Sequence, residues 1–100
     1  MPRYFSDEFL HRLRNEVPWK QLFQRLRWPH KIRDGQLAFL CPVCQEYNSA
    51  VNPRTHLGRC FHCERNFNPI EITMAVQHYD FVTAVKYLKP MLPPEQKPLV

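Results

Sequence analysis

The stretch CPVCQEYNSAVNPRTHLGRCFHC, residues 41–63, contains all four cysteines of this 100-residue chain. Two Cys-x2-Cys turns, 41–44 and 60–63, are separated by fifteen residues. A single turn of this kind is compatible with a redox pair. Two of them on either side of a hairpin-length insert instead place four thiolates as the corners of a tetrahedron. The spacing therefore predicts one Zn²⁺ bound by Cys41, Cys44, Cys60 and Cys63.

Four thiolates would fill the coordination sphere of this zinc, so we expect a structural rather than a catalytic metal. Its binding would contribute about 10–16 kcal/mol at neutral pH to the folding of a small domain. His56 and His62 lie close to the cysteines in sequence, but four cysteines make them unnecessary as ligands. A redox protein that uses Cys-x2-Cys remains an alternative, whereas disulfides are disfavoured in a reducing compartment.

The composition is that of a folded chain, with 44% hydrophobic and 13% aromatic residues. We expect one domain over residues 1–90 and a Pro-rich flexible tail over 91–100. No apolar run approaches the roughly 20 residues of a membrane-spanning helix. The charged N-terminal segment lacks the apolar centre of a signal peptide. These features predict a cytoplasmic protein with reduced thiols and no membrane partner.

The net charge of +5 is unevenly distributed. Five basic residues and no acidic residue lie between Lys20 and Arg33, just ahead of the cysteines. A solvated helix face could have the same composition, but this position favours a polyanionic partner.

Helix signals lie on both sides of the cysteine region. Ser6 is a predicted N-cap, and a second helix is expected from Pro18, at the first helical position, to Trp28-Pro29. Asn68 and Asp80 are predicted to cap two further helices. The residues expected to face the core are Phe9, Leu10, Leu13, Trp19, Leu22, Phe23, Leu26, Ile70, Met74, Ala75, Phe81, Ala84, Val85 and Leu88.

Two turn signals, Asp34-Gly35 and Asn52-Pro53-Arg54, predict hairpins next to the cysteines. Three to five short antiparallel strands are therefore expected. The predicted fold class is a small α+β zinc-binding domain: a zinc ribbon with a small antiparallel β-sheet, flanked by short N-terminal and C-terminal helices.

Several motifs in combination resemble one known family. FLCPVC (39–44) is similar to its first metal-binding turn and RCFHC (59–63) to its second, and VNP (51–53) resembles the turn before the second hairpin strand. The flanking segments 5–23, 31–42 and 69–88 resemble its helices and first hairpin, including Phe-x-x-Ala-Val-x-x-Leu at 81–88. The chain thus resembles, over roughly residues 5–92, the N-terminal zinc-binding domain of bacterial and phage DNA primases of the DnaG type.

Three departures from that family pattern are visible. Cys44 stands where the family usually has histidine, and zinc accepts either ligand. The insert between the cysteine pairs is shorter, and Thr-Pro-Ser-Phe is replaced by residues 47–50, Tyr-Asn-Ser-Ala. Asn66 and Asn68 replace the usual glycines after the second pair. The last two changes affect loops that could contact a template.

The resemblance implies a DNA-binding module that binds single-stranded template DNA and assists primer initiation in DNA replication. In this family, synthesis is performed by a separate domain with an acidic Mg²⁺ site, so the chain is not expected to be an enzyme. It would act with a primase, polymerase or helicase partner and take no small-molecule substrate. The alternative is a protein-interaction adaptor that docks onto a replicative helicase, polymerase or initiator of a phage or mobile element.

Within such a module, the predicted nucleic-acid contacts are basic side chains for phosphates and aromatic rings for bases. Arg59 and Phe61 alternate with Cys60, so they should share the strand face opposite the metal. Arginines near four thiolates and one Zn²⁺ could instead balance a formal charge of −2, and the rings could instead lie in the core. The predicted contacts are Lys31, Arg33, Arg54, Arg59 and Arg65, with Phe61, Phe39 and Trp28 as stacking candidates.

Overall fold

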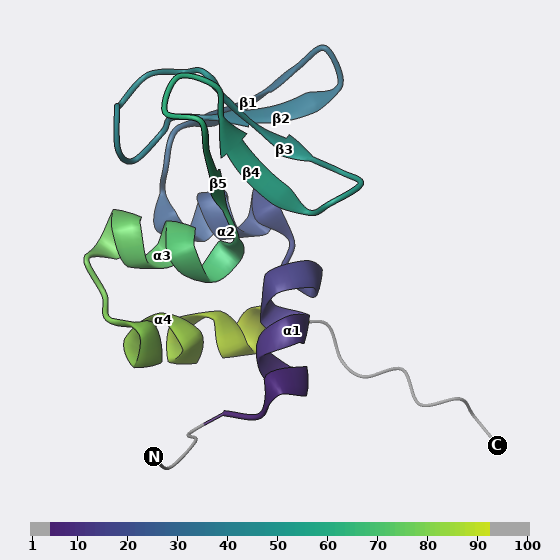
Figure 1. Ribbon diagram of the computed structural model, residues 1–100, viewed down its shortest axis with the longest axis vertical. Coiled ribbons are helices and arrows are strands. Elements are labelled where there is room, and N and C mark those ends of the chain that lie inside the picture. The colour runs from purple at the N-terminus through teal and green to yellow at the C-terminus, as the bar shows by residue number, and fades with distance from the viewer. Residues whose placement is uncertain (1–4, 93–100) are drawn as a thin grey trace, which may run out of the picture.

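The computed structural model describes residues 5–92, which form a small α+β domain with one antiparallel sheet (Figure 1). Two helices precede the sheet and two follow it, which confirms the predicted element types and their order. The elements are α1 (Asp7–Glu16), α2 (Trp19–Leu26), β1 (His30–Arg33), β2 (Gln36–Phe39), β3 (Ser49–Asn52), β4 (Leu57–Cys60), β5 (Arg65–Phe67), α3 (Pro69–Gln77), α4 (Phe81–Leu88) and a short 3-10 helix (Lys89–Met91).

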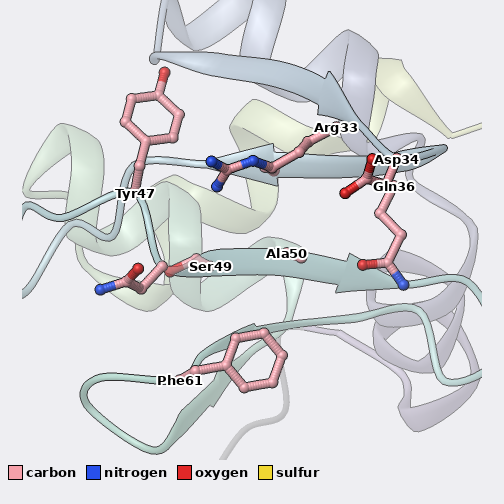
Figure 2. Close-up of a pocket in the computed structure, with 9 residues that line it drawn as sticks. Arg33, Asp34, Gln36, Tyr47, Ser49, Ala50 and Phe61 are labelled. Carbon is pink, nitrogen blue, oxygen red and sulfur yellow. The ribbon is translucent and has the colours of Figure 1, made fainter.

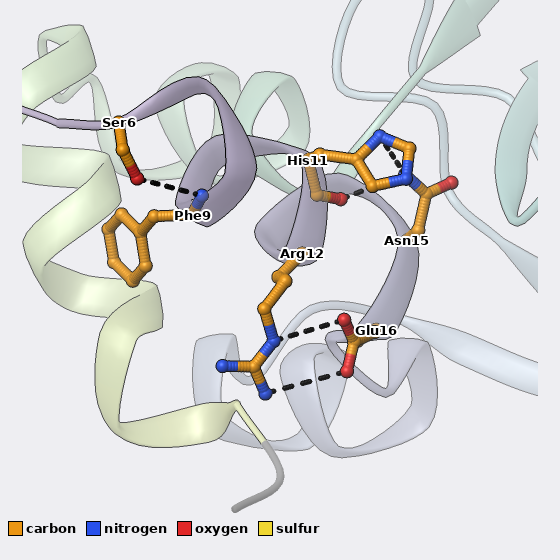
Figure 3. Close-up of polar contacts among 6 residues, drawn as sticks. All are labelled: Ser6, Phe9, His11, Arg12, Asn15 and Glu16. Carbon is orange, nitrogen blue, oxygen red and sulfur yellow. Dashed lines mark hydrogen bonds and ion pairs between the residues drawn. The ribbon is translucent and has the colours of Figure 1, made fainter. Parts of the chain in front are cut away.

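Local sequence signals account for where the helices begin. At the start of α1 the Ser6 hydroxyl accepts a hydrogen bond of 3.1 Å from the backbone N–H of Phe9 (Figure 3). One turn before its end, the Arg12 Nε donates to Glu16 Oε2 at 3.1 Å, an i,i+4 pair. Helix α2 begins at Trp19, one residue later than predicted, because Pro18 has an extended ψ of 120° and is the N-cap.

The two C-terminal helices have the predicted caps. The Asn68 side chain accepts from the N–H of Glu71, and the Asp80 carboxylate accepts from the N–H of Thr83, both at 2.8 Å. Hydrogen bonds from the Thr83 hydroxyl and N–H lower the pKa of Asp80 below its ordinary value of 3.8. These short-range bonds explain why the helix starts could be read from the sequence.

The sheet is a meander in which each strand pairs with its neighbour in the chain, in the order β1-β2-β3-β4-β5. The Asp34-Gly35 turn joins β1 to β2, and both residues have a left-handed backbone with φ of 51° and 79°. In Figure 1 the helices lie together on one side of the sheet. The side chains of one sheet face therefore pack on helices, and no helix within residues 5–92 covers the other face (Figure 1).

An aromatic stack joins α2 to the sheet. The ring centroid of Phe39 lies 5.0 Å from that of Phe23 and 6.2 Å from that of Trp19. Gly58 on β4 makes room for this stack, since a Cβ at this position would lie 2.8 Å from Phe39 Cζ. Phe39 is completely buried, so its assignment as a base-stacking residue was wrong.

The β3–β4 turn is attached to the link between the first two helices. The His56 ring donates from Nε2 to the carbonyl of Val17 at 2.8 Å, and the Trp19 indole donates to the carbonyl of His56 at 3.1 Å. Trp28 is also a structural residue, because its indole donates to the Leu40 carbonyl at 2.6 Å and it packs against the core. Trp28 is partly buried, so its predicted role in stacking stays a prediction.

The C-terminal part of the domain differs from the prediction in three places. In α3, Ile72 and Thr73 are completely buried, whereas Met74 and Ala75 are only half-buried. Phe81 is 41% exposed rather than in the core. Met91 and Leu92, assigned to the tail, pack against the core, and the rest of the predicted tail lies outside the described residues. No helix within residues 5–92 has the length and apolar character needed to cross a membrane.

Candidate metal centre and nucleic-acid interface

The four cysteines converge at one end of the sheet. All four Sγ atoms lie within 4.8 Å of one another. Two of the distances join the two Cys-x2-Cys turns, hereafter the knuckles: Cys41 to Cys63 at 3.9 Å, and Cys44 to Cys60 at 3.6 Å. All four are free cysteines. The predicted grouping of the four residues is confirmed, and the cluster is a plausible site for one metal ion.

The two knuckles have matching local structure. The first cysteine of each, Cys41 or Cys60, is buried, and its sulfur accepts a backbone N–H from within the knuckle at 3.4 or 3.3 Å. The residue after each second cysteine, Gln45 or Glu64, has a left-handed backbone with φ of 60° or 56°. This conformation turns the chain sharply after the second cysteine of each knuckle.

The cluster contains thiols with very different acidity. Burial acts to raise the pKa of Cys60, but it is outweighed by the hydrogen bond from the Cys63 N–H, by the nearby Ser49 hydroxyl and by the neighbouring thiols, which lower the pKa to about 6. Burial and the surrounding thiols raise the pKa of Cys63 to about 12, and burial also raises that of Cys44. The pKa of Cys60 thus lies well below the pKa values of Cys44 and Cys63.

Ser49 lies directly opposite Cys60 in the β3–β4 ladder. Its hydroxyl is the only buried side-chain nitrogen or oxygen within residues 5–92 that has no hydrogen-bond partner of standard geometry. Its position beside the Cys60 sulfur, close enough to lower the pKa of that thiol, makes a thiolate the natural acceptor for this O–H. The buried hydroxyl thus fits a metal-bound thiolate, as ligand-supporting groups around metal sites do.

Neither nearby histidine belongs to the cluster. His56 uses its ring on Val17 at the opposite end of β4, as described above. The His62 Nδ1 lies 3.7 Å from a carboxylate oxygen of Glu46, and both side chains are more than half exposed. Within the described chain, the only group of three or more potential ligands is the four cysteines.

The sheet face that points away from the helices carries a row of side chains across its five strands. Register pairs place Lys31 opposite Ala38, Ala38 opposite Ala50, Ala50 opposite Arg59 and Arg59 opposite Asn66. We call this surface the open face. The Lys31 ammonium lies 4.7 Å from the centroid of the Tyr47 ring, and the Arg59 guanidinium donates to Asn66 Oδ1 at 3.3 Å. Two cations thus flank two small side chains.

The predicted nucleic-acid contacts are not all on this surface. Arg33 and Phe61 line a groove on the open face, where Lys31 and Arg59 also lie. Arg54 is exposed in the β3–β4 turn, beyond the strand ends. Arg65 pairs with Cys60 in the ladder and therefore lies on the other face, with its guanidinium 5.3 Å from the Phe67 ring. The structure brings together Lys31, Arg33, Arg59 and Phe61, but not Arg54 or Arg65.

The groove has a volume of about 220 Å³ and lies above Ala38 and Ala50 (Figure 2). Its other lining residues include Gln36, Tyr47 and Asn48, which were not among the predicted site residues. The available signal was the alternation of side chains along β2 and β3, which places Gln36 and Ala38 on one face. The sequence does not specify the strand register that pairs Ala38 with Ala50. This pairing places two small side chains side by side and so forms the groove.

Comparison of the chain with models of known protein families and with curated proteins found no match.

Proposed function

We propose that this chain is a zinc ribbon of the DNA primase type, which binds single-stranded template DNA and supports primer initiation without catalysis of its own. The metal would be zinc. Tetrahedral zinc with zinc–sulfur bonds of about 2.3 Å has sulfur–sulfur edges of roughly 3.8 Å. The two distances between the knuckles, 3.6 and 3.9 Å, lie close to that value.

The proposed zinc holds the structure together and takes no part in chemistry. Cys41, Cys44, Cys60 and Cys63 would occupy all four positions of a tetrahedral ion and leave none for water or substrate. Its contribution is to fix the first knuckle, after β2, to the second, at the end of β4. It thereby sets the position of Phe61, which directly follows a ligand.

The observation that carries the DNA-binding proposal is the open face. Phe61 is 65% exposed on it, although burying such a ring elsewhere in the domain would be favourable. Arg59 lies two residues before Phe61 in the chain, and Lys31 lies on β1 across Ala38 and Ala50, three strands from Arg59, or roughly 14 Å at about 4.8 Å per strand. Cations that follow a backbone and aromatic rings that stack with bases are the two elements of single-strand binding. Primer synthesis itself would be performed by a primase or polymerase partner.

Binding of short single-stranded oligonucleotides by the zinc-loaded protein tests this proposal. At about 50 mM salt we expect clear binding, which weakens steeply toward 200 mM because phosphate contacts release counterions. Loss of one phosphate contact in Lys31→Ala should reduce the slope of log K against log salt by about 0.7. Arg14→Ala removes the same charge from an exposed position on α1 and should leave the slope unchanged. Absence of binding at low salt would refute the proposal and favour the protein-interaction alternative.

A further inference from the structure

The groove on the open face has the size of a small ligand site. Its volume of about 220 Å³ lies below the roughly 300–1,000 Å³ of pockets that hold drug-sized molecules. A planar ring system fits such a space, whereas two stacked nucleotides do not. The two alanines opposite each other in the β2–β3 ladder, Ala38 and Ala50, form a floor of methyl groups.

Two aromatic residues border this floor and are held in place. The backbone N–H of Phe61 donates to the carbonyl of Asn48 at 2.9 Å, which fixes the Phe61 backbone against the segment that carries Tyr47. The Tyr47 ring in turn lies against the Lys31 ammonium. Figure 2 shows the Phe61 and Tyr47 rings on opposite sides of the β2–β3 floor. The exposed Phe61 ring is therefore a preformed stacking surface beside a shallow slot.

The polar groups of the groove are unevenly distributed. The Asp34 carboxylate and the Gln36 amide lie at one end, and Arg33 extends along the groove toward Tyr47 (Figure 2). A phosphate at the Asp34 end would meet a like charge, so that end suits a hydrogen-bond donor instead. Among the parts of a nucleic acid, adenine, cytosine and guanine each carry an exocyclic amino group with two N–H donors, whereas an unpaired thymine offers only its single ring N3–H.

We propose that this groove binds one unpaired nucleobase that carries an exocyclic amino group, stacked on Phe61 with its amino group toward Asp34 and Gln36. This inference rests on the proposed single-strand binding and specifies which base the open face selects. Arg33 lies within reach of the adjacent sugar-phosphate or of the base edge. In a duplex the same amino group is engaged in base pairing, so the site selects single strands.

The selectivity can be measured with the zinc-loaded protein and a short oligothymidine that carries one central deoxyadenosine or deoxycytidine. Each substituted strand should bind at least about fivefold more tightly than all-thymidine DNA, the lower end expected for one specific polar contact. Asp34→Gly removes the carboxylate, and the turn tolerates it because Asp34 already has a φ of 51°. This variant should bind oligothymidine more tightly, through reduced repulsion, yet lose the preference for the substituted strands. A purely electrostatic role of Asp34 would raise all three affinities equally and would overturn the proposal.

Stacking is tested separately with 2-aminopurine as the central base, because its fluorescence is quenched on stacking with an aromatic ring. We expect quenching with the wild type, and loss of quenching with Phe61→Leu together with an affinity lower by about 5- to 140-fold. Phe81→Leu is the matched control, since Phe81 is 41% exposed on α4 and should behave as the wild type. Zinc content and circular dichroism establish that each variant is folded.

The two proposals fail in different ways. If the wild type binds no oligonucleotide at low salt, single-strand binding itself is wrong. If it binds all-thymidine and substituted strands equally, and Phe61→Leu changes nothing, then the base site is wrong and only the broader proposal of phosphate-driven binding is retained.

Discussion

Replacement of Gly58 by alanine tests the aromatic stack that joins the sheet to the helices. The new Cβ would lie 2.8 and 3.0 Å from two carbons of the Phe39 ring and 3.6 Å from the Trp19 indole. Carbon atoms in good contact are about 3.5–4.0 Å apart, so the ring would have to retreat by roughly 1 Å. Phe39 has no free space for this movement, because it is fully buried and stacked on Phe23 and Trp19.

Overpacking of this kind costs about 1–3 kcal/mol. In a domain of this size each kcal/mol lowers the melting temperature by about 4–8 °C, so Gly58→Ala should melt roughly 5–20 °C below the wild type. Thermal unfolding of the metal-loaded proteins, followed by circular dichroism, measures this shift.

The matched variant is Phe39→Leu, which removes the ring atoms that the new Cβ of Gly58→Ala would contact. Phe39→Leu alone should be destabilising because it leaves a cavity. In the double mutant the leucine relieves the clash, so the two effects should fall short of additivity by at least about 0.5 kcal/mol. An unchanged melting temperature in Gly58→Ala, or strict additivity in the double mutant, would refute the close contact between β4 and the stack.

Three further predictions concern the metal and one helix cap. Cys60→Ser, or a strong chelator, should unfold the central sheet by removing about 10–16 kcal/mol of metal binding, and a variant with native circular dichroism and stability without metal would contradict a structural role. Ser49→Ala should weaken zinc binding by about 10- to 100-fold in chelator competition, while an unchanged affinity would exclude the hydroxyl as a partner of Cys60. Because the pKa of Asp80 is lowered in the folded state, its contribution to stability is complete above 3.8 and is lost as the pH falls through the lowered value. Because acid protonates the thiolate ligands and releases the metal, this contribution is measured at neutral pH, where Asp80→Ala should melt below the metal-loaded wild type, and an unchanged melting temperature would show that the carboxylate is not responsible.

The elements that the sequence predicted correctly depend on neighbours in the chain. The caps Ser6, Asn68 and Asp80 act within three residues, and the apolar period of α2 selects the face that becomes buried. The cysteine spacing is equally local within each knuckle. These signals require no knowledge of how the sheet packs.

The features that the sequence did not specify depend on how the chain folds back on itself. The alternation of side chains along β2 places Phe39 on one face of the sheet but does not say whether that face is buried. Phe39 is buried because α2 packs on that face, next to Gly58. Arg65 follows the second knuckle closely, but the turn at Glu64 reverses the chain and places it on the face opposite Arg59. The groove above Ala50 depends on strand register, which a single sequence does not specify.

The left-handed residues that end the two knuckles have a consequence for metal loading. Glycine adopts this left-handed backbone conformation without a conformational penalty, whereas it is energetically unfavourable for Gln45 and Glu64. The cost is tolerated while the sulfurs are held together, and it is released once they separate. Both knuckles should therefore change conformation when the metal leaves. With glycine at these two positions the metal-loaded and metal-free chains would differ less, because no backbone strain would be released. In this domain the proposed binding surface would form only when the metal is present.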